Sequence, residues 1–254
     1  MQYYIIPCGT LKVKADEMIR PFSPEEISRT YPLDEEGRMT LAMNALLLKA
    51  PDRTLLIDPG CADFLPASWS GTYGLEFGRS LESHLADHGV IPGGITDVVF
   101  THLHFDHGSG AFIRSPGTIG KRFPNARYHV LQEHFNYASK PHRSEAGSFF
   151  TRLFRTIDRL SWLEDWSEPW IEFLPMQGHT RGMVVPVIHT DGEDLYYLSD
   201  LIPMTIFLER KSYSEYDLDP ERAVREKCDF LEGINRPSRF ILFHDPLKSS
   251  ILYP

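Results

Sequence analysis

The sequence has no long hydrophobic run, and this absence limits where the protein can work. No stretch of about 18 or more apolar residues occurs in the chain, so we expect no membrane-spanning helix. Residues 1–8 also lack a basic segment followed by a long apolar one, which argues against a secretory signal. We therefore expect a cytoplasmic protein with no membrane partner.

Cysteine is also scarce. The three cysteines, Cys8, Cys61 and Cys228, lie far apart, and none stands in a CxxC pair. An odd number of isolated cysteines fits reduced thiols better than a disulfide framework. We expect them to be buried or inert, because a free cysteine usually behaves as a small hydrophobic residue.

Basic residues are outnumbered and scattered. The 26 Lys and Arg residues stand against 35 Asp and Glu, and no basic block or stripe with interleaved aromatic residues occurs. We therefore expect no nucleic-acid partner. Apolar residues make up 42% of the chain, which is enough for a full core, and no linker divides it. We expect one domain over residues 1–254, and the sequence leaves open whether it forms a homodimer.

Apolar strand patterns and helical patterns alternate along the chain in two groups. Strands are expected at 3–6, 11–13, 41–48, 54–57, 97–101, 126–131, 171–174, 183–189, 195–198 and 239–243. Helices are expected at 80–88, 132–139, 149–160 and 220–232, with a short one near 24–28. Asp191-Gly192 is a hairpin signal between two of the strands. Each group closes with a helix, which indicates two α/β halves packed as one domain.

One segment is dense in metal-binding residue types. His102, His104, Asp106 and His107 fall within six residues, directly after the apolar run at 98–100. Two histidines two positions apart on extended chain point to one side, and a turn then brings the next two residues round. Four polar residues against a buried strand would be costly without partners. The segment therefore predicts a metal site.

Three isolated candidates, His179, Asp200 and His244, follow or sit beside apolar runs. The seven imidazole and carboxylate ligands are enough for two metal ions that share one carboxylate. Two such ions would activate a bridging hydroxide and polarise a carbonyl or phosphoryl oxygen. The other histidines are expected to be surface or core residues: His84, His88, His129, His134, His142 and His189.

The order of these motifs resembles that of the metallo-β-lactamase superfamily across essentially the whole chain. Asp58 in Leu56-Ile57-Asp58-Pro59-Gly60 is similar to that family's first motif, an acid that supports the site without being a ligand. The resemblance implies an α/β fold, the αββα sandwich of two mixed β-sheets flanked by helices. It also implies the ligand sets: metal one on His102, His104 and His179, metal two on Asp106, His107 and His244, and Asp200 bridging.

Departures from the family pattern narrow the reaction class. Dizinc β-lactamases usually carry Cys at the position of Asp200, and flavodiiron proteins carry Glu at that of His104. Residues 102–108 are similar to the version seen in quorum-quenching lactonases. Residues 200–203, the helix from Pro220 and residues 243–246 resemble a lactonase- or organophosphatase-like subgroup of hydrolases. Lactonases often have a Tyr as oxyanion donor where this chain has Pro203, so Tyr213 or Tyr216 would have to replace it.

We interpret the chain as a dinuclear-metal-dependent hydrolase of a small-molecule ester or lactone, with a metal-bridging hydroxide as nucleophile. Zn²⁺ is the expected metal, and Mn²⁺ or Fe²⁺ are alternatives. Asp106 and Asp200 are the expected catalytic carboxylates, with Asp106, or a water on metal two, protonating the leaving alkoxide. Phe105 and residues 203–216 are expected in the pocket wall. The aromatic residues of 62–78 could line an apolar pocket, and core or lid packing is the alternative.

Other reactions stay open at this point. Within hydrolysis, a phosphotriester or phosphodiester and a glyoxalase II-like thioester are the alternative substrates. From other classes, a mononuclear iron oxygenase would show one iron per chain and oxygen uptake. A metal-binding protein without turnover would bind metal and hydrolyse none of these substrates.

Overall fold

A computed structural model describes residues 1–254, apart from the side chains of residues 67 and 70. The chain divides into two compact units, which are residues 1–9 with 43–167 (unit 1) and residues 10–42 with 168–254 (unit 2). Strands β1 (Gln2–Lys14) and β2 (Arg38–Lys49) each contribute residues to both units. One domain over residues 1–254 therefore stays a prediction.

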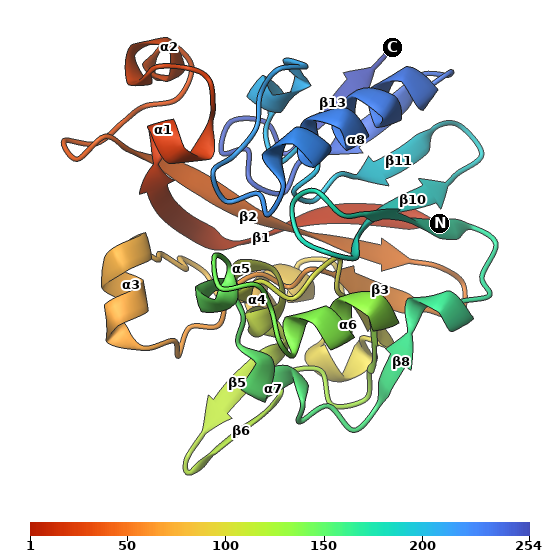
Figure 1. The fold of residues 1–254 in the computed structure, drawn as a ribbon. Helices are drawn as coiled ribbons and strands as arrows, with labels where there is room; N and C mark the ends of the chain where they lie inside the picture. The colour runs from red at the N-terminus through yellow and green to blue at the C-terminus, as the bar shows by residue number, and fades with distance from the viewer. The chain divides into compact units, whose positions relative to one another are not determined.

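A mixed sheet with strand order β1-β2-β3-β4-β7-β8 carries unit 1 (Figure 1). Its later strands are β3 (Thr54–Ile57), β4 (Asp97–Val99), β7 (Arg127–Val130) and β8 (Leu160–Trp162). Strand β3 runs antiparallel to β2, whereas β4, β7 and β8 continue in parallel. Parallel strands are normally buried on both faces, and the apolar residues of β3 and β4 are indeed fully buried.

Short helices and one hairpin connect these strands. The helices of unit 1 are α3 (Ala67–Tyr73), α4 (Leu81–Ala86), α5 (Phe105–Gly108), α6 (Gln132–Ala138) and α7 (Thr151–Phe154), and the 3₁₀ turns are η1 (Pro92–Gly94), η2 (Ser109–Ala111), η3 (Ala146–Ser148) and η4 (Leu163–Asp165). Strands β5 (Phe112–Ser115) and β6 (Thr118–Lys121) pair as a separate hairpin. Ser80 caps α4 by accepting a hydrogen bond from the Ser83 amide, so the helix predicted at 80–88 is confirmed.

Unit 2 contains a second mixed sheet, with strand order β13-β12-β11-β10-β9. The strands are β9 (Ile171–Met176), β10 (Met183–His189), β11 (Asp194–Tyr197), β12 (Ser238–Ile241) and β13 (Ser250–Tyr253). Helices α1 (Ala15–Met18), α2 (Pro24–Ser28) and α8 (Pro220–Gly233) and the turn η5 (Thr205–Leu208) complete the unit. Strands β10 and β11 are antiparallel around Asp191-Gly192, and α8 leads into the parallel pairing of β11 with β12. The predicted hairpin and the predicted 220–232 helix are therefore confirmed.

One element prediction was wrong. The helix expected at 149–160 is only the single turn α7, because Leu160 pairs with Tyr128 in the sheet and begins β8. The strands expected at 3–6 and 11–13 are confirmed, and both belong to one longer strand, β1, which includes Gly9 at φ +118°. Strand β13 and the β5–β6 hairpin were not expected. The α/β class, with mixed sheets flanked by helices, is confirmed.

Among the described residues, no helix combines the length and apolar character needed to cross a membrane.

Candidate metal centre

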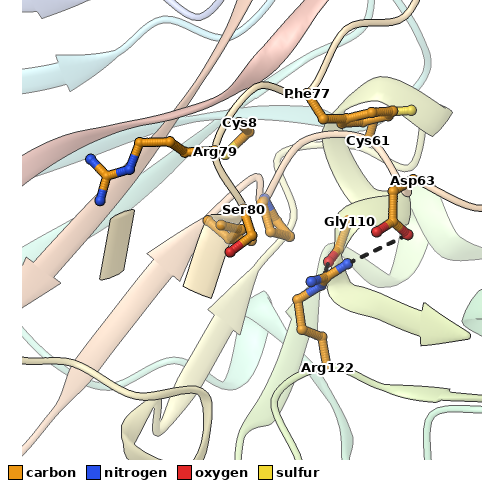
Figure 2. Close-up of a pocket in the computed structure, with 10 residues that line it drawn as sticks. Cys8, Cys61, Asp63, Phe77, Arg79, Ser80, Gly110 and Arg122 are labelled. Carbon is orange, nitrogen blue, oxygen red and sulfur yellow. Dashed lines mark hydrogen bonds and ion pairs between the residues drawn. The ribbon is translucent and has the colours of Figure 1, made fainter. Parts of the chain in front are cut away.

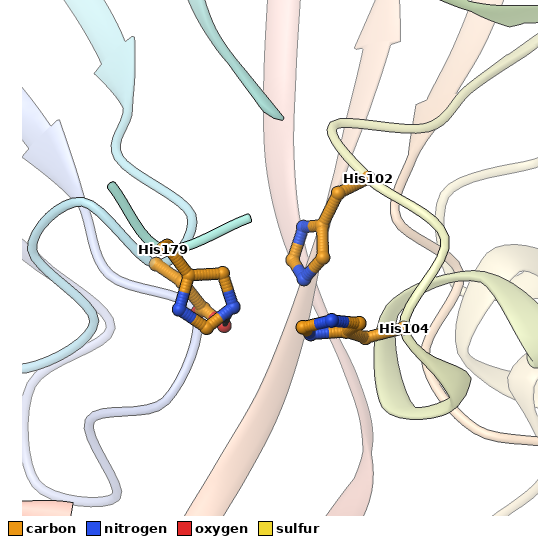
Figure 3. A group of neighbouring side chains, drawn as sticks. His102, His104 and His179 are labelled. Carbon is orange, nitrogen blue, oxygen red and sulfur yellow. Dashed lines mark ion pairs between the residues drawn. The ribbon is translucent and has the colours of Figure 1, made fainter. Parts of the chain in front are cut away.

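In unit 1, the ligand-rich segment leaves the end of β4 and enters the one-turn helix α5. His102 and His107 are fully buried, and His104 is 6% exposed. The rings of His102 and His104 lie 4.5 Å apart, between centroids (Figure 3). The ring of His107 lies 4.1 Å from that of His102. Asp106 extends the cluster, with a carboxylate oxygen within 4.8 Å of a ring nitrogen of His107. Unit 1 therefore brings together all four of its predicted ligands.

Asp58, directly after the end of β3, bonds to this segment through both carboxylate oxygens. Its Oδ1 accepts a hydrogen bond of 2.8 Å from the Thr101 amide, and its Oδ2 accepts from Thr101 Oγ1 at 2.5 Å and from His107 Nδ1 at 2.9 Å. Burial raises the pKa of the Asp58 carboxyl, and these donors act in the opposite direction. Asp58 thus engages Nδ1 of His107, so Nε2 is the ring nitrogen that could coordinate a metal ion.

The outer nitrogen of His102 has a neutral partner. The Thr101 hydroxyl donates its hydrogen bond to Asp58, so the Thr101 oxygen accepts the hydrogen bond of 3.1 Å from His102 Nδ1. That places the proton on Nδ1, so Nε2 is the ring nitrogen that could coordinate a metal ion.

His104 is held differently, through its Nε2. This nitrogen donates to Glu145 Oε2 at 3.3 Å, and Glu145 is only 5% exposed. The Tyr137 hydroxyl donates to the other oxygen of Glu145, and Phe149 forms an isolated β-bridge with His104. Nδ1 is therefore the ring nitrogen of His104 that could coordinate a metal ion. Nothing in the sequence pattern singled out Glu145.

His134 anchors the same loop without being a ligand. The Leu103 amide donates to His134 Nε2 at 2.8 Å, and His134 is fully buried. A buried backbone amide needs such an acceptor, so the prediction of a core histidine is confirmed here.

In unit 2, the three predicted ligands come from three separate loops. His179 follows β9, Asp200 follows β11, and His244 follows β12. Asp200 Oδ2 lies 3.1 Å from His179 Nε2, and Asp200 Oδ1 lies 3.5 Å from His244 Nε2. The two oxygens of one carboxylate therefore face two different imidazoles, which is the arrangement that a bridging carboxylate requires.

The outer nitrogens of these two histidines are also engaged. His179 Nδ1 donates to Asp217 Oδ1 at 2.9 Å, and His244 Nδ1 donates to the carbonyl oxygen of Ala42 at 2.8 Å. Burial lowers the pKa of His179, but the carboxylates of Asp200 and Asp217 outweigh it and raise the pKa to about 10. Asp217 is a second supporting carboxylate that the sequence pattern did not reveal.

The donor chemistry within each unit fits divalent metal ions. Each of the five histidines uses one ring nitrogen for a protein partner and presents the other, as metal-ligating histidines almost always do. Two ligand atoms about 2.0–2.2 Å from one tetrahedral zinc would lie about 3.3–3.5 Å apart. The two Asp200 distances, 3.1 and 3.5 Å, are close to that spacing.

Part of the expected aromatic wall lies beside this segment of unit 1. The rings of Trp69 and Tyr73 lie 4.8 and 4.9 Å from that of Phe105. Burial, and then the charge of Asp106, raise the pKa of Tyr73. Phe64, by contrast, stacks under Arg114. In unit 2, the Tyr216 hydroxyl is already donated to Glu17 at 3.0 Å.

A separate small cavity in unit 1 contains two of the cysteines. It has a volume of about 40 Å³ and is lined by Cys8, Cys61, Asp63 and Arg122, among others (Figure 2). Arg122 donates to the Gly110 carbonyl and also pairs with acidic side chains. Burial raises the pKa of Cys8 to about 12 and also raises that of Cys61. The prediction of free, buried thiols is confirmed for both.

Comparison with solved structures shows what fold these elements form. A probable metal-dependent hydrolase from Staphylococcus aureus is similar, with a TM-score of 0.87 and 22% identity over 99% of this chain and 92% of that one. A dizinc quorum-quenching lactonase in complex with a product, N-hexanoyl-L-homoserine, gives 0.79 and 20% over 98% and 88%. A hydrolase of the β-lactamase superfamily gives 0.76 and 21% over 100% and 94%.

Among curated proteins, none matches the chain. The model of the metallo-β-lactamase superfamily matches residues 40–208, which is more than half of the chain and includes every predicted ligand except His244. The chain therefore belongs to the metallo-β-lactamase superfamily, and this membership supports a hydrolase as its enzyme class.

Proposed function

We propose that the ligands of the two units form one dinuclear metal centre within a single domain. His102, His104 and His179 would hold metal one, Asp106, His107 and His244 would hold metal two, and Asp200 would bridge them. The observation that carries this proposal is Asp200 itself, whose two oxygens face the Nε2 atoms of His179 and His244 at 3.1 and 3.5 Å.

The proposed reaction is hydrolysis of a small-molecule ester or lactone. When bound, two divalent ions would lower the pKa of a water and polarise the substrate carbonyl. Zinc suits a set of imidazoles and carboxylates, as would manganese or iron. Cys8 and Cys61 offer no alternative nucleophile, because burial keeps both thiols protonated.

The chain's own residues supply orientation and proton transfer. The Asp106 carboxylate would take the proton that the attacking water loses and return it to the leaving alkoxide. Phe105, with Trp69 and Tyr73 packed on it, would present an apolar aromatic surface to an acyl group. The fold likeness to a dizinc lactonase supports the lactone as the first substrate to test.

Pro203 sets this chain apart from lactonases that carry a tyrosine at the same position. Its carbonyl accepts the His244 amide at 3.0 Å, so the position supports the loop and carries no hydroxyl donor. The Tyr216 hydroxyl donates to Glu17 and is therefore not assigned to the substrate carbonyl, which metal one, when bound, would polarise. A cytoplasmic location belongs to the same proposal and is supported by the free cysteines.

Initial-rate hydrolysis of a long-chain acyl-homoserine lactone by zinc-, manganese- or cobalt-loaded protein tests the function, read as proton release. The expected result is a metal-dependent rate that Asp200→Ala removes. An aryl ester, a thioester and a phosphotriester are assayed in parallel. Two bound metals with no lactone or ester turnover would refute the substrate class, and turnover of another substrate would replace it.

A further inference from the structure

We propose that Glu145 and Asp217 are positioning residues that strengthen metal one, supplying the negative charge that metal two receives directly from Asp106. This inference rests on the proposed dinuclear centre and concerns how its two ions are retained. It follows from the different partners that the five histidines have for their outer nitrogens.

The two proposed metals differ in the charge of their ligands. Metal two has its own carboxylate ligand, Asp106, besides the shared Asp200. Metal one has three neutral imidazoles and only the shared carboxylate. The metal-one site would therefore bind a divalent cation more weakly than the metal-two site, because less negative charge faces the ion.

Glu145 supplies charge on the unit 1 side of metal one. Its carboxylate accepts the Nε2 proton of His104 at 3.3 Å and is 5% exposed, so solvent screens it little. Tyr137 fixes the carboxylate through its hydroxyl, and the His142 amide in turn donates to the Tyr137 oxygen at 3.1 Å. This chain of contacts sets the plane of the His104 ring.

Asp217 does the same on the unit 2 side. Its Oδ1 accepts the Nδ1 proton of His179 at 2.9 Å, and its side chain is 5% exposed. Its Oδ2 accepts the Ser214 amide at 2.9 Å, and the Leu218 amide donates to the His179 carbonyl at 2.9 Å. The carboxylate and the histidine therefore lie on two segments joined by backbone hydrogen bonds.

A carboxylate that accepts the outer proton of an imidazole makes the inner nitrogen a stronger donor. Two of the three metal-one histidines have such a partner. Among the metal-two histidines, His107 has one in Asp58, whereas His244 donates from Nδ1 to the neutral carbonyl of Ala42. Glu145 and Asp217 thus offset the missing carboxylate ligand of metal one.

The test measures zinc affinity in two single-metal backgrounds by competition with a chromophoric chelator. His244→Ala is meant to keep metal one, and His102→Ala to keep metal two. Asp217→Asn and Glu145→Gln each remove a charge but keep an oxygen that can accept the hydrogen bond. We expect each to weaken zinc binding by about 10- to 100-fold in the His244→Ala background. In the His102→Ala background, we expect less than about a threefold change.

The chain offers matched controls. Asp97 is buried and accepts from the ring of His129 at 2.8 Å in unit 1, and Asp194 does so from His189 at 3.1 Å in unit 2. Neither histidine is a proposed ligand. Asp97→Asn and Asp194→Asn therefore report what loss of a buried carboxylate does through the fold alone. The visible spectrum of bound Co²⁺ should change in Glu145→Gln and Asp217→Asn and stay constant in the controls.

Equal weakening in both backgrounds, or weakening no greater than in the controls, would overturn the inference. Because the readout is metal affinity, its failure is separate from that of the proposed function. Selective weakening with no hydrolysis would support the positioning role and refute the function. Hydrolysis with unchanged metal affinity in both variants would do the reverse.

Discussion

The candidate metal-binding residues of the two units are distributed differently along the chain. In unit 1, four candidates stand within six consecutive residues, and the backbone between β4 and α5 sets their spacing. In unit 2, the three candidates come from three loops, and hydrogen bonds between distant segments set their spacing. Both units use supports from far along the chain, such as Glu145 and Asp217, but in unit 2 one residue, Asp200, contacts the other two candidates. The difference indicates that unit 2 depends on Asp200 more than unit 1 depends on any one support.

The largest expected effect comes from removing the residue on which unit 2 converges. Asp200→Ala should abolish two-metal binding and lower hydrolysis by more than about 100-fold, since its oxygens face both His179 and His244. Metal content and initial rates measure this, with Asp194→Asn as control for loss of a buried carboxylate in unit 2. Full activity with one metal remaining would contradict the bridged centre.

In unit 1, the comparable support is Asp58. Asp58→Asn keeps only one oxygen, so it cannot accept both from the Thr101 amide at Oδ1 and from the Thr101 hydroxyl and His107 Nδ1 at Oδ2. We expect metal two to bind about 10- to 100-fold more weakly. The free energy of unfolding should fall by about 1–3 kcal/mol, because a buried donor loses its partner. Chelator competition and urea unfolding measure the two effects, and an unchanged metal affinity would remove Asp58 from the account.

A smaller effect is expected from the loop anchor in unit 1. His134→Ala leaves the buried Leu103 amide without its acceptor, which should cost about 1–3 kcal/mol of stability. Metal affinity should fall less than in Asp58→Asn, because the His134 ring bonds to the Leu103 backbone amide and not to the side chain of a proposed ligand. Urea unfolding compared with His142→Ala, which changes an exposed histidine, measures it. A loss no larger than that of the control would show that the anchor is dispensable.

The smallest expected effect is a pH dependence in unit 2. Lys227 is buried against Glu209 and Ser212, donating to both carbonyl oxygens, and burial lowers its pKa from 10.5 to about 8. Between these values the unfolded chain binds a proton that the folded chain has released, so this group's contribution to stability rises with pH. Below about pH 8 that contribution is absent.

Lys227→Met removes the titrating amine and so measures its pH-dependent contribution to stability. Unfolding free energies measured from pH 7.5 to 10 should rise less steeply, or fall more steeply, in the variant than in the parent chain. Parallel curves would show that Lys227 keeps its ordinary pKa in the folded protein.

Much of the fold could be predicted because the patterns there are local. The strands at 54–57 and 183–189 have the predicted bounds, and Pro24–Ser28 is the predicted helix. The 149–160 prediction failed because its apolar residues have helical spacing, whereas pairing of Leu160 with Tyr128 decides the end of that segment. Strand β13 was missed because its place in the sheet depends on pairing with β12.

The same distinction holds at the candidate site. The density of ligands at 102–107 is visible in the sequence, and so are the isolated His179, Asp200 and His244. Glu145 and Asp217 were not predictable, because they lie 41 and 38 residues from the histidines they contact and belong to no local motif. Single acidic residues in loops are common, so only the folded contacts distinguish these two.

We propose that the ligands of both units form one centre with two ions. X-ray absorption spectroscopy of the zinc-loaded protein measures the number of zinc ions and the distance between them. The account predicts two zinc ions per chain and a metal–metal vector of about 3.5–4 Å. One zinc per chain, or two with no metal–metal vector, would contradict it.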